Sequence, residues 1–347
     1  MKGHRLYRPR SVSLSARLRT AKKALLLCLF TALTLCMLLE NEKALELSLT
    51  GLNLWFEKMI PTLLPFMILS GILIRMNLSD SFARLFSPLL RPVFRLSDSC
   101  LYVIVIGFLC GFPMGARVTA ESLQRGRLSH REASLLLSFC NNIGPIYFSG
   151  FVLTLFPVAK PWLFWAGMYL LPLLYGLFLR YTLYRDIPLY AAPVRPLTAA
   201  SSLRAAFSLR AASESYARAA RSQKPSLLEQ MQDSISSSLV SIASLGGYMI
   251  LFNLMNLLPD LLLPARASLP RALCGCILEI TSGLSRLAPS DALWGFILLP
   301  LGGLSCIAQT YSMIRETDLS LKQYVLHKCI QTLLAFGYYS LIFRFAV

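Results

Sequence analysis

Three short segments of this sequence place polar or helix-breaking residues in the middle of apolar runs. They are GFPMGARVTAE at 111–121, FCNNIGP at 139–145 and LEITSG at 278–283. A helix that breaks inside a membrane protein offers N-terminal amides to an anion and free carbonyls to a cation. Neither a histidine–carboxylate grouping nor a nucleophile elbow accompanies these segments. They therefore predict binding of a small solute, and we expect no enzymatic activity.

Asn141 and Asn142 carry side-chain amides that can bind the carboxylates, ring nitrogen or hydroxyls of a solute. The competing interpretation is that both amides only join neighbouring helices. Gly144 and the proline after it break the helix at this point and free backbone groups. The break favours the binding role.

Glu279 lies near the middle of an apolar run, where an ionisable residue indicates function by default. Because an ionised carboxylate would repel an anionic solute, we expect Glu279 to be protonated during binding or to bind a coupling proton or sodium ion. The alternative is a glutamate at the membrane surface. The sequence leaves open whether 272–310 spans the membrane twice or re-enters it.

The predicted binding site gathers these breaks near the bilayer midplane, because an unsatisfied polar group there costs several kcal/mol. Its residues are Asn141, Asn142, Gly144, Gly111, Gly115, Glu279, Thr281, Ser282, Gly302 and Gly303. No metal site and no other cofactor is expected.

Composition indicates that lipid surrounds most of the chain. Of 347 residues, 55% are hydrophobic and only 15% charged, and the mean hydropathy is +0.58. The net charge of +17 is attributed to membrane topology and attraction to anionic lipid, since no basic groove interleaved with aromatic residues suggests nucleic acid. The nine cysteines fall mostly within apolar runs and form no metal-binding or disulfide pattern.

The apolar runs predict an all-α, polytopic membrane protein. A retained first helix is expected at 24–39, and an amphipathic helix lying at the interface should precede a span at 60–76. The short, broken run at 101–115 lies between basic loops and predicts a re-entrant hairpin. Further spans are expected at 133–156, 162–184, 235–258, 272–287, 293–310 and 324–347.

Charge divides the chain into four regions. They are 1–44 with the cytoplasmic N-terminus and first transmembrane helix, 45–184 as the first membrane half, 185–225 as a basic cytoplasmic linker, and 226–347 as the second membrane half. Most lysines and arginines then face the cytoplasm, as the positive-inside rule requires. The turn at 156–161 is expected on the other face.

The two membrane halves also share a faint spacing. Gly111 precedes the Leu128–Ser129 pair by the same interval that separates Gly302 from Leu319–Ser320. Together with the parity of the spans, this match predicts an inverted-topology repeat with broken or re-entrant helices, the architecture of alternating-access transporters. Two unrelated helical halves are the alternative.

The segment GFPMGARVTAESLQRGRLSHREASLLLSFCNNIGPIYFSG resembles the sporulation integral membrane protein YlbJ family, whose members carry the nucleoside-recognition Gate domain. LEITSG and IPTLLPFMILSGIL are similar to that family as well. The resemblance implies a helical membrane protein of endospore-forming bacteria, related in its domain to concentrative nucleoside transporters. It further implies that the protein takes part in moving dipicolinic acid toward the spore. The implied location of the protein is the cell membrane, or a forespore membrane in a sporulating cell.

The sequence therefore predicts a permease that moves a small anionic solute, dipicolinic acid by resemblance, by alternating access. One alternative is a membrane scaffold or signalling component needed for sporulation, and a second is a transporter of nucleoside-type solutes. The expected partners are the solute and the lipid bilayer, without nucleic acid. A homo-oligomer is left open.

Overall fold

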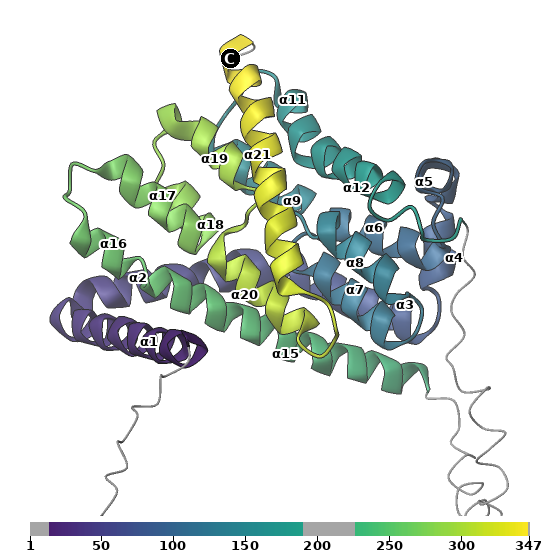
Figure 1. The fold of residues 1–347 in the computed structure, drawn as a ribbon, viewed down its shortest axis with the longest axis horizontal. Helices are drawn as coiled ribbons and strands as arrows, with labels where there is room; N and C mark the ends of the chain where they lie inside the picture. Colours follow the sequence, from purple (N-terminus) through teal and green to yellow (C-terminus); the bar gives the residue numbers. More distant parts are fainter. Residues whose placement is uncertain (1–13, 190–225, 346–347) are drawn as a thin grey trace, which may run out of the picture.

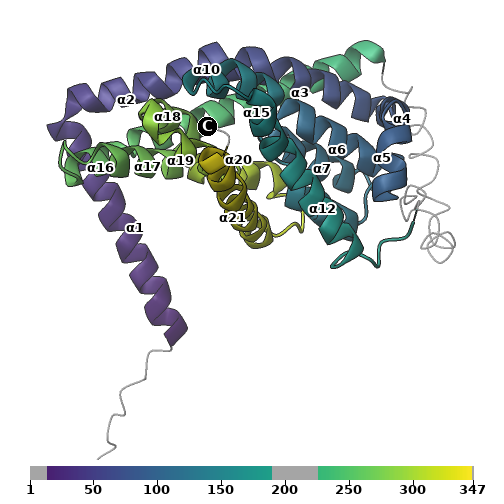
Figure 2. The same cartoon turned by 90° about the horizontal axis from the view of Figure 1, so that it is seen from above.

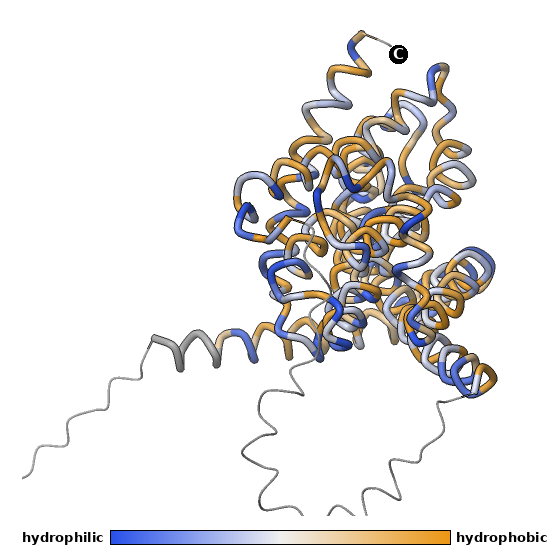
Figure 3. The backbone as a smooth tube through the Cα atoms, turned by 90° about the vertical axis from the view of Figure 1, so that its right-hand side faces the viewer, coloured by the Kyte–Doolittle hydropathy of each residue, from blue (hydrophilic) through white to orange (hydrophobic). Residues whose placement is uncertain are grey.

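The computed structural model describes residues 14–189 and 226–345, with side chains from residue 21 onward. All regular elements in these residues are helices (Figure 1). Five are long and apolar enough to cross a membrane, or six if 87–94 and 98–110 form one bent span. Apolar residues predominate along the helices (Figure 3), and Leu38 and Leu333 are 74% and 69% exposed. Such surface needs lipid contact, which confirms the polytopic helical membrane protein.

The first helix, α1 (Leu14–Leu39), contains the predicted first span. Its 19-residue apolar segment, Ala21–Leu39, is only 6% buried. The helix packs against α2 and α16 and extends away from the other helices (Figure 2). Leu33 is buried there in a small cluster with Leu254 and Leu257. Most of the segment 21–39 is exposed and offers its side chains to lipid.

The helix predicted to lie at the interface is continuous with the span that follows it. α2 (Asn41–Leu54), the π-helical turn η1 (Trp55–Met59) and α3 (Ile60–Arg75) form one helix of 35 residues. At 1.5 Å per residue this helix is about 52 Å long, whereas the hydrocarbon core is about 30 Å thick. It therefore tilts strongly or extends past the membrane.

Short helices lead from α3 to a helical hairpin. They are α4 (Ser79–Arg84) and α5 (Ser87–Phe94), and α5 meets the next helix at 110°. α6 (Asp98–Cys110) and α7 (Met114–Gln124) pack side by side and turn at 111–113. Gly111 has a φ of 87°, a conformation that favours glycine. The hairpin has the shape predicted for a re-entrant segment.

The rest of the first half is a broken span and a final helix. α8 (His130–Phe139) begins with a capping box between Ser129 and Glu132 and ends at the break at 140–144. After the break follow α9 (Pro145–Tyr147), η2 (Phe148–Val152) and α10 (Leu153–Leu155), and then α11 (Pro161–Trp165), η3 (Ala166–Leu170) and α12 (Leu171–Tyr181).

The second half repeats this order. Its elements are α15 (Leu227–Leu254), α16 (Leu257–Leu262), α17 (Ser268–Leu278), α18 (Ile280–Ser285), the 3₁₀ turn η4 (Pro289–Asp291), α19 (Ala292–Leu298), α20 (Gly303–Ile314) and α21 (Leu321–Phe345). α17 and α18 pack as a second hairpin. Residues 289–314 are long and apolar enough to form one membrane span despite their break. Within 272–310 the chain therefore forms a short helical hairpin followed by a broken apolar segment, and whether the hairpin re-enters the membrane stays a prediction.

Corresponding helices of the two halves run antiparallel. Trp55 Nε1 donates to the Ile242 carbonyl at 2.8 Å, and Arg75 pairs with Asp233 at 3.8 Å, so α2–α3 and α15 run in opposite directions. α11–α12 and α21 do the same, since Tyr175 OH lies 2.6 Å from His327 Nδ1 and Tyr338 OH donates to the Leu163 carbonyl at 2.8 Å. This is the arrangement of an inverted-topology repeat.

The register of the repeat differs from the one predicted. Gly111 lies at the turn of the first hairpin, whereas Gly302 lies in the break of the span 289–314. The element that corresponds to the 140–144 break is therefore the break that contains Gly302. The matching Leu-Ser pairs arose because both precede helices, where serine is a common N-cap.

Several basic loops meet at one end of the molecule. Arg127 pairs with Asp80 at 3.5 Å and Arg131 with Asp186 at 2.7 Å, while His130 Nε2 lies 3.2 Å from the Asp318 carbonyl. The hydrogen bonds from Arg131 lower the pKa of the exposed Asp186 carboxyl. The linker at 190–225 lies outside the described residues, so its cytoplasmic position stays a prediction.

Candidate functional site

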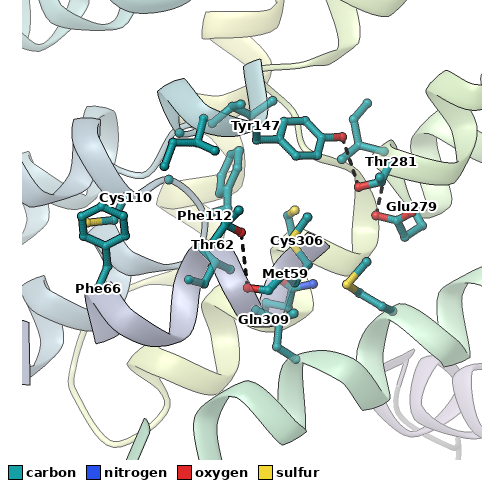
Figure 4. A pocket seen from close by; sticks show the side chains of 18 of the residues that line it. Met59, Thr62, Phe66, Cys110, Phe112, Tyr147, Glu279, Thr281, Cys306 and Gln309 are labelled. Carbon is teal, nitrogen blue, oxygen red and sulfur yellow. Dashed lines mark hydrogen bonds between the residues drawn. The ribbon is translucent and has the colours of Figure 1, made fainter. Parts of the chain in front are cut away.

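A pocket lies where the helix breaks of the two halves meet (Figure 4). It holds about 640 Å³ of space between atoms, part of it open to the surroundings. Apolar side chains from α3, the first hairpin and α15 form most of its wall. The polar side chains that line it are Thr62, Tyr147, Glu279, Thr281 and Gln309.

Glu279 supplies the carboxylate of this pocket and is 2% exposed. Its side chain accepts hydrogen bonds from the backbone N–H of Thr281 at 3.1 Å and of Ser282 at 2.8 Å. These are N-terminal amides of α18, which we expected to be available to an anionic solute. Glu279 occupies them itself, so at this helix the protein provides its own anion.

The hairpin that carries Glu279 depends on a close approach of its two helices. A Cβ at Gly283 would lie 2.1 Å from the Cys276 nitrogen, so only glycine fits between α17 and α18 here. This contact explains the glycine of the LEITSG segment. It places Glu279 at the tip of the hairpin, in extended conformation between two helices.

Tyr147 and Gln309 line the pocket although the sequence did not single them out. Tyr147 OH donates to Thr281 Oγ1 at 3.1 Å, which joins the two halves across the pocket. Gln309 Nε2 donates to Ser305 Oγ at 3.0 Å. A lone tyrosine or glutamine in an apolar helix gives little signal, because both types are common in structural roles.

The glycines of the predicted site hold each hairpin against a helix break. A Cβ at Gly111 would lie 2.5 Å from the Gly144 nitrogen, and one at Gly115 would lie 2.2 Å from the Cys140 carbonyl oxygen. In the second half, a Cβ at Gly303 would lie 2.8 Å from the Cys276 carbonyl oxygen. Gly302 has a φ of 71°, and a Cβ there would lie 3.2 Å from Phe112 Cζ.

Asn141 joins three helices and is fully buried. Its amide nitrogen donates to Thr310 Oγ1 at 2.9 Å and to Tyr324 OH at 3.1 Å, and its oxygen accepts from the Ala116 N–H at 3.3 Å. Both ends of the side chain are occupied. The geometry therefore favours the helix-joining interpretation for Asn141 in this state.

Asn142 instead contacts a buried lysine that the sequence analysis did not single out. Lys328 Nζ donates to Asn142 Oδ1 at 3.0 Å and to Gln331 Oε1 at 3.1 Å, and it is 0% exposed. The rule that singled out Glu279 applies equally to a lysine within the apolar run of α21. It lies four residues after the predicted start of the span, close to the expected membrane surface, where lysines are common.

The predicted site residues are buried together but do not share one cavity. Gly111, Gly144, Glu279 and Thr281 line the pocket, and the Ser282 N–H donates to the Glu279 side chain. Asn142 does not line this pocket, and its partner Lys328 has its Nζ 4.9 Å from the centroid of the Phe112 ring, which does.

Comparison with known proteins identifies relatives of the chain. Residues 56–153 match the family model named Gate, described as nucleoside recognition. The chain is 28% identical over 341 residues to the sporulation integral membrane protein YlbJ of Bacillus subtilis strain 168, which covers 90% of this chain and 80% of that protein. No solved structure matches. The resemblance predicted from the sequence is therefore confirmed, with a Gate segment that contains the first hairpin and the Asn141–Asn142 break, in a chain similar over most of its length to a sporulation integral membrane protein.

Proposed function

We propose that this protein is a permease that moves a small anionic solute across the membrane by alternating access. The observation that carries the proposal is the pocket itself, which is lined by breaks from both halves and contains a buried carboxylate. Breaks of this kind at the interface of inverted repeats form the solute sites of secondary transporters. A scaffold would not need a cavity with a buried carboxylate between its halves.

Dipicolinate is the proposed solute. The similarity to a sporulation integral membrane protein supports a solute used in spore formation, and the two carboxylates of dipicolinate fit a site that contains hydrogen-bond donors. In a sporulating cell the protein then resides in the cell membrane or a forespore membrane.

Glu279 is proposed to couple transport to a cation. Ionised, it would repel a dianion, so a proton or a sodium ion must accompany the solute into the pocket. The carboxylate at the tip of a hairpin is placed where such an ion can enter with the solute and leave with it.

A nucleoside is the second candidate solute. The Gate family is described by nucleoside recognition, and the neutral groups of Thr62, Tyr147 and Gln309 could bind a base or ribose. A nucleoside carries no carboxylate, so it would not conflict with an ionised Glu279.

Purified protein in liposomes tests the proposal. We expect uptake of labelled dipicolinate above that of empty liposomes, and faster uptake when a proton or sodium gradient is directed inward. Uptake of labelled uridine or adenosine above that of empty liposomes, without uptake of labelled dipicolinate, would shift the assignment to nucleosides. If folded protein moves neither solute under any gradient, the scaffold interpretation replaces transport.

A further inference from the structure

Lys328 is a buried lysine whose side chain has no carboxylate partner among the described residues. Its ammonium group contacts two side-chain amide oxygens, of Asn142 at 3.0 Å and Gln331 at 3.1 Å. Neither oxygen carries a full charge. A buried charge that lacks a counter-ion costs several kcal/mol, and a lysine within a membrane helix adds to that cost.

The two amides are held so that their oxygens face the ammonium group. Asn142 Nδ2 donates to the Phe139 carbonyl at 2.6 Å, and Gln331 Nε2 donates to the Ser138 carbonyl at 2.6 Å. Both carbonyls belong to the last turn of α8, just before the helix break. The lysine is thus positioned by the break, and it leaves one of its three N–H groups for another acceptor.

Phe112 contacts both Lys328 and the pocket that contains Glu279. Its ring lines the pocket, and Lys328 Nζ, which does not line it, lies 4.9 Å from the ring centroid. Phe112 sits at the tip of the first hairpin, between Gly111 and Pro113, and Gly302 leaves room for its ring.

The lysine's partners also line a narrow crevice. Asn142 and Gln331 lie there with Gly167, Pro300 and Ala335, and the crevice is too small to hold a solute. The pocket lined by Phe112 is therefore the space from which a solute would reach the lysine.

We infer that Lys328 binds the carboxylate of the transported solute, and that the Phe112 side chain must move for the solute to reach it. This inference rests on the proposed function. The ammonium N–H that no amide uses donates to a solute carboxylate oxygen, and Asn142 and Gln331 keep the ammonium in place. The substrate class is an aromatic or aliphatic carboxylate rather than a neutral nucleoside.

The cluster explains how one site can contain an acid and still accept an anion. In the proposal the solute carboxylate meets Lys328, which contacts Phe112, while the coupling ion meets Glu279, which lines the pocket. The two charges are separated in the state described and would be bridged by solute and ion when the Phe112 side chain moves.

The test compares Lys328→Met with Lys322→Met in the same helix. Methionine is apolar and only one atom shorter than lysine. Lys322 is exposed, so its substitution removes a charge from α21 without touching the cluster. The readouts are KM and kcat for dipicolinate, and the preference for dipicolinate over its neutral diamide. Lys328→Met should raise KM at least about tenfold and abolish the preference, because a charge-assisted hydrogen bond is lost. Lys322→Met should change neither.

Folding and transport are separated by a binding measurement on the purified protein. Dipicolinate should raise the melting temperature of the wild type and of Lys328→Arg, which keeps the charge, but not of Lys328→Met. Thermal stabilisation that is lost in Lys328→Met supports the site even if the liposomes carry no flux, in which case only the transport proposal fails. Equal stabilisation of both proteins, or none of the wild type, would overturn the assignment of Lys328.

Discussion

Glu279 combines a structural task with the proposed coupling task. Its carboxylate caps α18 through two backbone amides while it lines the pocket. Removal of its charge should therefore affect ion coupling strongly and folding weakly, because a neutral side-chain oxygen can still accept a hydrogen bond from the helix.

We predict that Glu279→Gln abolishes the acceleration of solute uptake by a proton or sodium gradient and lowers stability by only about 1 kcal/mol. Uptake with and without the gradient, and thermal unfolding in detergent, check the two parts. Glu316→Gln is the control, because Glu316 is exposed at a loop and pairs with the neighbouring Arg315. A variant that stays fully coupled would remove Glu279 from the coupling role.

The two neighbouring asparagines should behave differently. Asn141→Ala removes hydrogen bonds that join three helices, and we predict a loss of roughly 2 kcal/mol in stability with little change in KM. Asn142→Ala should instead raise KM, because it leaves Lys328 with Gln331 alone. Melting temperatures and uptake kinetics of both variants give the comparison. A raised KM for Asn141→Ala at normal stability would mean that Asn141 contacts the solute.

At the scale of helices, the two hairpins and the two breaks determine where the site forms. Gly283 holds the second hairpin closed because a Cβ would meet the Cys276 backbone at 2.1 Å. Backbone cannot give way as a flexible side chain can, so any larger residue should separate α17 from α18.

We predict that Gly283→Ala destabilises the protein by about 3 kcal/mol and abolishes uptake, since overpacking between backbones distorts both helices. Gly337→Ala is the matched control, because it lies within α21 and a Cβ there meets nothing within 4 Å. That control should be neutral or slightly stabilising. Similar melting temperatures for the two variants would contradict the close packing of the hairpin.

Sequence periodicity predicted most of the helices and the three breaks, because apolar runs and glycine–proline interruptions are local signals. It did not predict that α2 and α3 are continuous, since the polar residues Glu57 and Lys58 look like a boundary when read alone. The sequence also did not predict that the site residues fall into two groups, one around Glu279 and one around Lys328. Asn142 meets Lys328 across 186 positions of sequence, and no local pattern reports a contact of that kind.

At the scale of the molecule, opposite directions of corresponding helices require that the two halves enter the membrane from opposite sides. The turn at 156–161 and the linker should then face different compartments. We predict that cysteines introduced at Lys160 and at Ser201, in a background without native cysteines, react with an impermeant maleimide from opposite sides. Lys160 is exposed, and Ser201 lies outside the described residues. Reaction of both from the same side would contradict the topology.

Alternating access is the central claim, and exchange across the membrane tests it most directly. Liposomes that contain the purified protein are loaded with unlabelled dipicolinate, and entry of labelled dipicolinate is followed without an ion gradient. If one site faces each side in turn, label should enter loaded liposomes faster than liposomes without internal solute. The reason is that unlabelled solute, as it leaves, brings the site back to face the outside. Equal entry in both cases would indicate a channel, and no entry beyond that of protein-free liposomes would contradict transport by this chain.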